Sequence, residues 1–344
     1  MTPTPTPIPT AATAPPPPPT ARATDWTAWH LHLGTTARSA HDRVVTDVIG
    51  PTIRELAPGT PWFFIRYWQS GPHLRLRVGD LDTAARARVE AALAERLAVA
   101  GAPAPGEEPL DPAAYRSGAE RLAAAGETGE NTSVKALLPP GVHPAVYEPE
   151  FDRYGGRALM PAAESLFTLS STLVLAALPK VGSERQRAVL ALRGTVAVAA
   201  ALGDPAERAY YYAHGLGAWR AWAAEAGHPA ALLDTITRVE GAVTLDPGSH
   251  GPFAGWHARI AAHADEIREQ SPTHPGMVLF SHAHMLHNRL GLSLLEELRT
   301  YAVLAHAFPV PENTPVPENT PVPENTPVPE NTPVPENTPV PRNV

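Results

Sequence analysis

The residues best suited to chemistry begin with an arginine inside an aromatic strand pattern. The run PWFFIRYW (61–68) is rich in aromatic and β-branched residues, which favours a β-strand. Alternate strand residues share a face, so Arg66 points the same way as Phe64 and Trp68. Burying a guanidinium among such neighbours costs free energy unless an anion pairs with it. We therefore expect Arg66 to bind an anion, supplied either by the protein or by a substrate.

A second basic run follows a Ser-Gly-Pro break. HLRLRV (73–78) alternates polar and apolar residues, so the two runs predict a β-hairpin over 61–78. Arg75 and Arg77 share one face of their strand, and His73 joins them. The facing strands would then concentrate three guanidiniums, counting the arginine of the first strand, and one imidazole. The alternative for Arg75 and Arg77 is an ordinary solvated basic face.

The segment YEPEFDRYGG (147–156) gathers three carboxylates, one arginine and two tyrosines before a glycine pair. Glu150 and Arg153 are three residues apart, so they lie on one side of a turn or of a first helical turn. One interpretation is a structural ion pair in a loop. The other is a functional carboxylate whose pKa is set by the nearby arginine.

A histidine-rich segment, SHAHMLHNR (281–289), has helical spacing. On a helix His284 lies four residues from Asn288 and three from His287, so these side chains share a face. Three interpretations remain open: a metal site, core or capping histidines, and a histidine that transfers protons near neutral pH. The Glu of a His-Glu-x-x-His motif is absent, and we predict no bound metal.

Together these segments describe a cationic pocket with a histidine and a carboxylate. Such a set suits proton abstraction next to a carbonyl followed by departure of a carboxylate, because arginines stabilise both developing anions. The chain has no cysteine, which excludes disulfides, thiolate catalysis and Cys-ligated metals. Neither a Gly-x-Gly-x-x-Gly motif after a strand nor a phosphate loop occurs, so we predict no cofactor.

The strands and helices that could position these residues occupy different parts of the chain. Residues 25–34 alternate as a strand, 36–56 have helical spacing, and 82–100 predict a helix that begins at an Asp cap. Later helices are predicted near 111–125, 161–178, 183–202, 205–226, 229–242, 253–269 and 276–307, the last broken at Gly291. Early antiparallel strands followed by a mainly helical C-terminal half favour an α+β fold.

The two ends of the chain hold about half of its 41 prolines. Residues 1–24 are rich in Pro and Thr, and 309–344 repeat Pro-Val-Pro-Glu-Asn-Thr. Neither segment has the apolar residues of a core, so we predict two disordered arms around one catalytic domain at 25–308. An alternative for the repeats is a ligand for an aromatic groove.

Net charge and hydropathy restrict the kinds of partner that this protein can bind. The chain carries −8, of which the tail contributes −4 through five glutamates and one arginine, so no basic field for nucleic acid remains. No uninterrupted apolar run reaches the ~18–20 residues of a membrane span. The N-terminus lacks the positive region of a secretory signal. We expect a cytoplasmic protein that binds neither membrane nor nucleic acid directly.

The motifs, in this order, resemble the thiopeptide-type bacteriocin biosynthesis domains, which match the C-terminal elimination domain of lanthipeptide dehydratases. The resemblance spans about 26–307. It rests on four segments: WFFIRYWQSGPHLRLRV (62–78), YEPEFDRYGG (147–156), AESLFTLSS (163–171) and HAHMLHNRLG (282–291).

The resemblance implies elimination of glutamate from glutamylated Ser or Thr of a precursor peptide, which leaves dehydroalanine or dehydrobutyrine. The family's catalytic residues match Arg66, Glu150, Arg153 and His284. His284 and Glu150 would share the proton transfers, and the two arginines would hold the developing anion and the leaving glutamyl group. Substrate binding is assigned to six other polar residues of the motifs: His73, Arg75, Arg77, Tyr154, Asn288 and Arg289.

The family's full-length dehydratases carry a long glutamylation domain before this region, whereas here a Pro-rich arm precedes residue 25. The resemblance thus implies a standalone elimination subunit that acts on a precursor peptide with its leader, after a separate dehydratase subunit has glutamylated it. The alternative within the family is a pyridine synthase, which joins two dehydroalanines by a formal 4+2 aza-cycloaddition and releases the leader. A non-enzymatic leader-binding partner is a third possibility. Retention of all four catalytic residues favours elimination.

Overall fold

A four-stranded antiparallel sheet forms the N-terminal part of the molecule. The computed structural model describes residues 24–126, 134–246, 248 and 250–311, so the predicted disordered arms lie almost entirely outside the described residues. The strands run in the order β2-β3-β1-β4, with the bounds β1 (Trp26–His32), β2 (Trp62–Tyr67), β3 (His73–Gly79) and β4 (Gly141–Ala145). The predicted hairpin is confirmed as β2 and β3.

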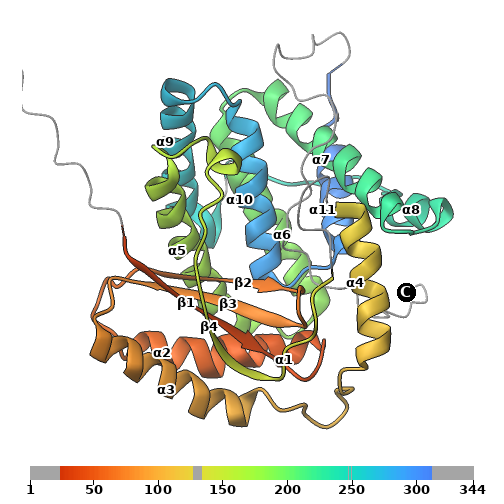
Figure 1. Ribbon diagram of the computed structural model, residues 1–344. Helices are drawn as coiled ribbons and strands as arrows, with labels where there is room; N and C mark the ends of the chain where they lie inside the picture. The colour runs from red at the N-terminus through yellow and green to blue at the C-terminus, as the bar shows by residue number, and fades with distance from the viewer. Residues whose placement is uncertain (1–23, 127–133, 247, 249, 312–344) are drawn as a thin grey trace, which may run out of the picture.

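One face of the sheet is apolar and is covered by the helices that follow β1 and β3. Trp29, Leu31, Leu74 and Leu76 are fully buried on this face. They pack against a helical layer (Figure 1), because amphipathic helices bury their apolar stripes against such a surface. This layer comprises α1 (Arg38–Arg43), the π-helical turn η1 (Val44–Ile49), α2 (Gly50–Arg54) and α3 (Thr83–Ala100).

The C-terminal half is helical, as expected for the predicted α+β class, which the structure confirms. Its helices lie on the other side of the sheet from α2 and α3 (Figure 1). They are α5 (Met160–Ala177), α6 (Glu184–Ala199), α7 (Pro205–Glu225), α8 (Ala230–Thr237), α9 (Ala254–Gln270), α10 (Pro275–Leu290) and α11 (Leu294–Ala307). Helix α4 (Pro112–Gly126) comes before β4 in the chain and contacts α7. The predicted break at Gly291 is confirmed, since Gly291 takes the left-handed conformation (φ 77°) between α10 and α11.

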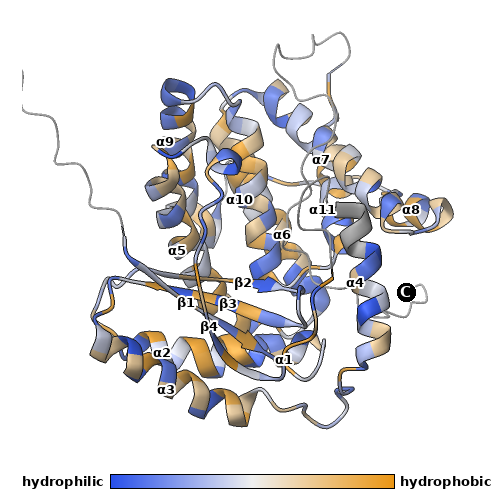
Figure 2. Ribbon diagram, in the orientation of Figure 1, coloured by the Kyte–Doolittle hydropathy of each residue, from blue (hydrophilic) through white to orange (hydrophobic). Residues whose placement is uncertain are grey.

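The centre of the helical half is α10, which is buried over most of its length and contacts α5, α6 and α9. Its C-terminal end reaches β2, an edge strand of the sheet. Hydrophilic residues interrupt the apolar colouring where this end of α10 meets the sheet (Figure 2). These polar side chains position the candidate site.

Among the residues that the structure describes, one helix has the length and composition of a membrane span, namely α5 with the turn that follows it (Met160–Lys180). In the fold α5 contacts β2, α9 and α10. Its residues Leu166 and Val174 belong to the main hydrophobic core. This packing accounts for the apolar composition of α5.

Candidate functional site

A cavity of about 410 Å³ lies on the polar face of the sheet. Its walls come from β1, β2, β3, the segment after β4, α5 and α10. Four cationic side chains line it against two carboxylates, so its net charge is positive. These residues are Arg75, Arg77, Lys135 and Arg289, with Glu148 and Glu150.

Strand register places two of the arginines in this cavity. Arg75 pairs across the ladder with Ile65 and Arg77 with Phe63, so all four residues share one face. The Arg75 guanidinium lies 3.3 Å from the centroid of the Tyr67 ring, a cation–π contact. Arg77 is only 6% exposed, and its burial lowers the pKa of the guanidinium to about 9. The alternative of a solvated basic face is therefore wrong for Arg77.

Arg289 reaches the same cavity from α10 and is also buried. Its Nε donates to Ser171 Oγ at 3.0 Å, and its Nη1 donates to the Met285 carbonyl at 3.0 Å. Burial lowers the pKa of Arg289 to about 10. Two buried guanidiniums from different elements thus line one cavity, an arrangement that favours an anionic ligand.

The predicted pair of Glu150 and Arg153 is confirmed. Arg153 Nη1 donates to Glu150 Oε2 at 2.7 Å, and Glu150 lines the cavity. The pair is held by a short 3-10 turn that ends at Gly155, whose φ of 84° suits glycine. Tyr154 also lines the cavity, and burial raises the pKa of its hydroxyl to about 12. The hydroxyl is therefore a hydrogen-bond donor at neutral pH.

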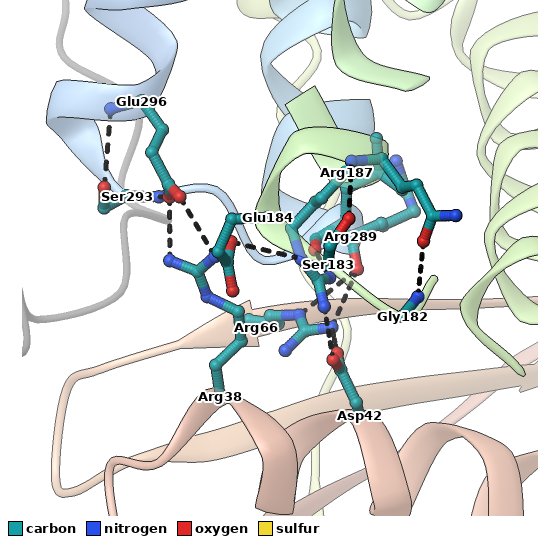
Figure 3. A network of polar contacts seen from close by, with 12 residues as sticks. Arg38, Asp42, Arg66, Gly182, Ser183, Glu184, Arg187, Arg289, Ser293 and Glu296 are labelled. Carbon is teal, nitrogen blue, oxygen red and sulfur yellow. Dashed lines mark hydrogen bonds and ion pairs between the residues drawn. The ribbon is translucent and has the colours of Figure 1, made fainter. Parts of the chain in front are cut away.

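Arg66 lies on the opposite face of the sheet, because the ladder pairs Arg66 with Leu74 and not with an arginine. The expected concentration of three guanidiniums on one face is therefore wrong. Arg66 is 2% exposed and donates through Nη2 to Asp42 Oδ1 at 2.6 Å. Its Nε and Nη2 also donate to the Arg289 carbonyl at 3.2 and 3.1 Å (Figure 3). The expected anionic partner of Arg66 is a protein carboxylate.

Asp42 also binds a second arginine. Arg187 Nη2 lies 2.7 Å from Asp42 Oδ2, and Arg187 Nη1 donates to the Leu290 carbonyl (Figure 3). Burial raises the pKa of Asp42, but the Arg66 and Arg187 guanidiniums hold that pKa below its usual value. Both arginines thus bind carbonyls at the C-terminal end of α10, where the helix dipole favours cations. The network joins α1, β2, α6 and α10.

His284 is buried away from the cavity wall. Its Nδ1 lies 3.0 Å from Glu297 Oε2, and Nδ1 of His287 lies 3.0 Å from the same oxygen. The His284 ring also packs against Trp219, with centroids 5.0 Å apart. Burial lowers the pKa of His284 although Glu297 opposes the shift. Among the open interpretations, these contacts agree with a core histidine.

Asn288 binds the edge strand of the sheet. It accepts from the Arg66 backbone N–H at 2.8 Å and donates to the Arg66 carbonyl at 2.9 Å. Ser171 Oγ accepts from the Phe64 N–H at 3.2 Å. Side chains of α5 and α10 therefore satisfy three outward backbone groups of β2, namely the Phe64 N–H and both groups of Arg66.

Of the sequence-predicted residues, the cavity lining brings together Arg75, Arg77, Glu150, Tyr154 and Arg289, with Arg153 bound to Glu150. Four others lie outside that lining: Arg66, His73, His284 and Asn288. His73 instead packs between the rings of His30 and His32.

Sequence reasoning missed three acidic residues that organise the site. Asp42 and Glu297 pair with the buried cations and histidines described above. Glu164 on α5 is also buried, and burial raises the pKa of its carboxyl. The one available signal was a single acidic residue within an apolar helical pattern, as Glu164 shows in AESLFTLSS (163–171).

Comparison with known proteins defines the class of this chain. Its residues 26–308 match the family described as lantibiotic biosynthesis dehydratase C-term. The chain therefore belongs to that family, whose members modify ribosomally made peptides in antibiotic biosynthesis. No curated protein sequence matches the chain significantly.

Two solved structures share the fold. The pyridine synthase TbtD from thiomuracin biosynthesis has a TM-score of 0.63 at 19% identity, covering 82% of this chain and 97% of TbtD. The tRNA-dependent lantibiotic dehydratase MibB from Microbispora sp. 107891 has a TM-score of 0.52 at 19% identity, covering 84% of this chain and 28% of MibB. At these identities the similarity establishes the fold.

Proposed function

We propose that this protein is a lyase that eliminates glutamate from glutamylated Ser or Thr residues of a precursor peptide. The observation that carries the proposal is the cavity in which Arg75, Arg77 and Arg289 meet Glu150. Elimination produces two anions, an enolate and a leaving carboxylate. Buried guanidiniums stabilise such charges more strongly than exposed ones do, because little water screens them.

The reaction balances with residues of the cavity alone. Glu150 takes the α-proton of the modified residue. The electron pair of the broken Cα–H bond then forms the Cα–Cβ double bond as the Cβ–O ester bond breaks. Glutamate leaves as a carboxylate, and Arg77 and Arg289 bind it. Arg153 keeps Glu150 oriented through the hydrogen bond from Arg153 Nη1 to Glu150 Oε2. Here Glu150 acts alone as the base, and Arg66 and His284 position the elements that carry the cavity.

A purified-component assay tests this proposal. A synthetic leader-bearing peptide with a glutamylated Ser is incubated with the full-length protein, and mass spectrometry follows the loss of glutamate. Dehydroalanine and free glutamate are expected. Arg77→Gln should reduce turnover by about 100-fold or more, the typical effect of removing one charge-stabilising donor. The matched control is Arg268→Gln, since Arg268 forms an exposed pair with Asp265. An unchanged glutamylated peptide contradicts the proposal.

A pyridine synthase is the second candidate, and a separate observation favours it. Much of the cavity wall is aromatic, with Phe63, Tyr67, Tyr147, Tyr154 and Phe167 among its residues. Such a wall suits stacking against the flat, conjugated groups of a cyclising peptide. A peptide that already bears two dehydroalanines and its leader separates the candidates. Formation of a pyridine macrocycle with release of the leader supports the synthase.

The proposed lyase needs two partners. One is the precursor peptide with its leader, and the other is a separate dehydratase subunit that glutamylates the peptide. No nucleic acid is required by the proposed step. Adding the glutamylating subunit to an unmodified precursor should restore dehydration only when this protein is also present. Dehydration without this protein contradicts the proposed division of labour.

A further inference from the structure

Three histidines meet on the polar face of the sheet, next to the cavity. His30 and His32 come from β1, and His73 of β3 lies directly opposite His32 in the ladder. The ligand nitrogens of the three rings all lie within 4.8 Å of one another. The His73 ring centroid is 4.7 Å from that of His30 and 4.3 Å from that of His32.

Three ring nitrogens of this cluster lack a hydrogen-bond partner among the described residues, although the two rings that carry them are buried. His32 is 1% exposed and His73 is 0% exposed. Neither ring nitrogen of His32, nor Nε2 of His73, has a hydrogen-bond partner among the described residues. Leaving a buried polar group unsatisfied costs about 1–3 kcal/mol. A shared ligand would satisfy these nitrogens together.

The hydrogen bond that His73 makes fixes the orientation of a donor atom. His73 Nδ1 lies 2.9 Å from the Gly71 carbonyl, so Nδ1 carries the proton and Nε2 presents its lone pair. This bond from the second nitrogen to a backbone carbonyl is the outer-shell contact that metal-binding histidines usually make. His73 is thus arranged as a ligand before any ion binds.

We infer that His30, His32 and His73 form a binding site for a divalent transition-metal ion, and we assign it to Zn²⁺. Neutral imidazole is a preferred ligand of zinc. Within the described part of the chain no carboxylate or thiolate belongs to the cluster, which disfavours Mg²⁺ and Ca²⁺. Zinc–nitrogen bonds of ~2.0–2.1 Å require the rings to turn inward, so that their nitrogens lie closer together.

The surroundings place this site beside the proposed chemistry and limit its affinity. His30 lines the cavity, and His32 lines a second hollow of about 320 Å³, so the trio lies between the two spaces. Three protein ligands leave one tetrahedral position for a further donor. Arg75 pairs directly with His30, and its positive charge opposes a cation. Removing that charge by Arg75→Gln should therefore tighten zinc binding.

Zinc titration of the untagged full-length chain tests the inference. The protein is treated with a chelator and dialysed, and Zn²⁺ is added in competition with a chromophoric chelator. One Zn²⁺ per chain is expected. Because loss of an outer-shell partner alone costs roughly 10–100-fold in affinity, His32→Ala should cost at least that much. Co²⁺ should give the intense visible bands of a four-coordinate site.

Two further variants separate binding at the three rings from a loss of folding and from binding at other histidines. His30→Gln changes a partly exposed ligand, and it should weaken binding while the far-ultraviolet circular dichroism stays that of the parent. His257→Ala is the matched control, because His250 and His257 form another close ring pair, with centroids 3.8 Å apart. Absence of stoichiometric binding overturns the inference. Binding that survives both ligand substitutions, or that is lost in His257→Ala, overturns it as well.

Discussion

Buried charges dominate the energetics at the scale of single residues. Asp42 accepts from both Arg66 and Arg187, which are 2% and 6% exposed. Removing one partner of a buried ion pair leaves a charge without compensation. Asp42→Asn should therefore lower the free energy of unfolding by about 3–5 kcal/mol in urea titrations. Asp265→Asn, which removes an exposed partner of Arg268, should cost less than about 1 kcal/mol. Equal losses would contradict a specific role for Asp42.

The histidine cluster makes stability depend on pH. Burial lowers the pKa of His32 to about 4, well below its unfolded value of 6.5. Between these values the unfolded chain binds more protons than the folded chain, so stability rises with pH and falls as the solution is acidified. Metal-free protein should lose stability as the pH drops from 6.5 to 4 in denaturant titrations. His32→Phe should flatten this slope, and an unchanged slope would contradict it.

For single residues, the sequence was least able to predict which side chain each residue contacts. The sequence predicts that Arg66 needs an anion, because strand alternation places it among large apolar residues. It does not predict Asp42, since that contact depends on how α1 packs under the sheet. The pair of Glu150 and Arg153 was predictable because it lies within one turn. Arg66 and Arg75 were wrongly placed together because register, which decides the face, is a property of two strands.

At the scale of elements, α10 holds the edge of the sheet. Asn288→Ala would leave the Arg66 backbone N–H and carbonyl without their side-chain partner in a buried position. The expected loss is about 2–6 kcal/mol, given ~1–3 kcal/mol for each unsatisfied group. Thr172→Ala removes an exposed hydroxyl that donates to the Thr168 carbonyl within α5, and should cost less. Thermal unfolding of both variants checks this order, and the reverse order contradicts it.

The turn after α10 gives a second prediction. A Cβ at Gly291, where φ is 77°, would lie 2.8 Å from Arg66 Cζ. Gly291→Ala should therefore cost more than the ~1–2 kcal/mol of a left-handed conformation alone. Gly217 lies inside α7, and a Cβ there meets no atom within 4 Å. Gly217→Ala should stabilise the helix by roughly 0.5–1 kcal/mol. Melting temperatures that move in the same direction would contradict this contrast.

Most elements were predictable because their hydrophobic periods are long and regular. The predicted helix over 82–100 is confirmed as α3, with Asp82 accepting from the Ala85 N–H as its cap. Residues 36–56 form three short pieces, and the π-helical turn in the middle has no sequence signature. β4 was missed because it is a short edge strand that contains Pro144, a residue tolerated at sheet edges.

At the scale of the whole molecule, the proposed catalytic domain spans residues 25–308. The Pro-Val-Pro-Glu-Asn-Thr repeats begin at Pro309 and contain few residues that a core would bury. Truncation after residue 308 should leave turnover and melting temperature unchanged in the elimination assay. A large loss of activity in the truncated chain would show that the repeats take part in substrate capture.

The contacts at the end of α10 decide how the chain can be divided. Asp42 and Arg66 precede residue 126, whereas Arg187 and the carbonyls of Arg289 and Leu290 follow it. In a fragment of the first 126 residues, the Arg66 guanidinium would lack its carbonyl acceptors, and the edge strand β2 would lack the side chains of α10 that bind it. Two separately expressed halves should therefore form the folded protein only when both are present during refolding. Breakpoints for chimaeric proteins belong near the ends of residues 26–308, the region that matches the family.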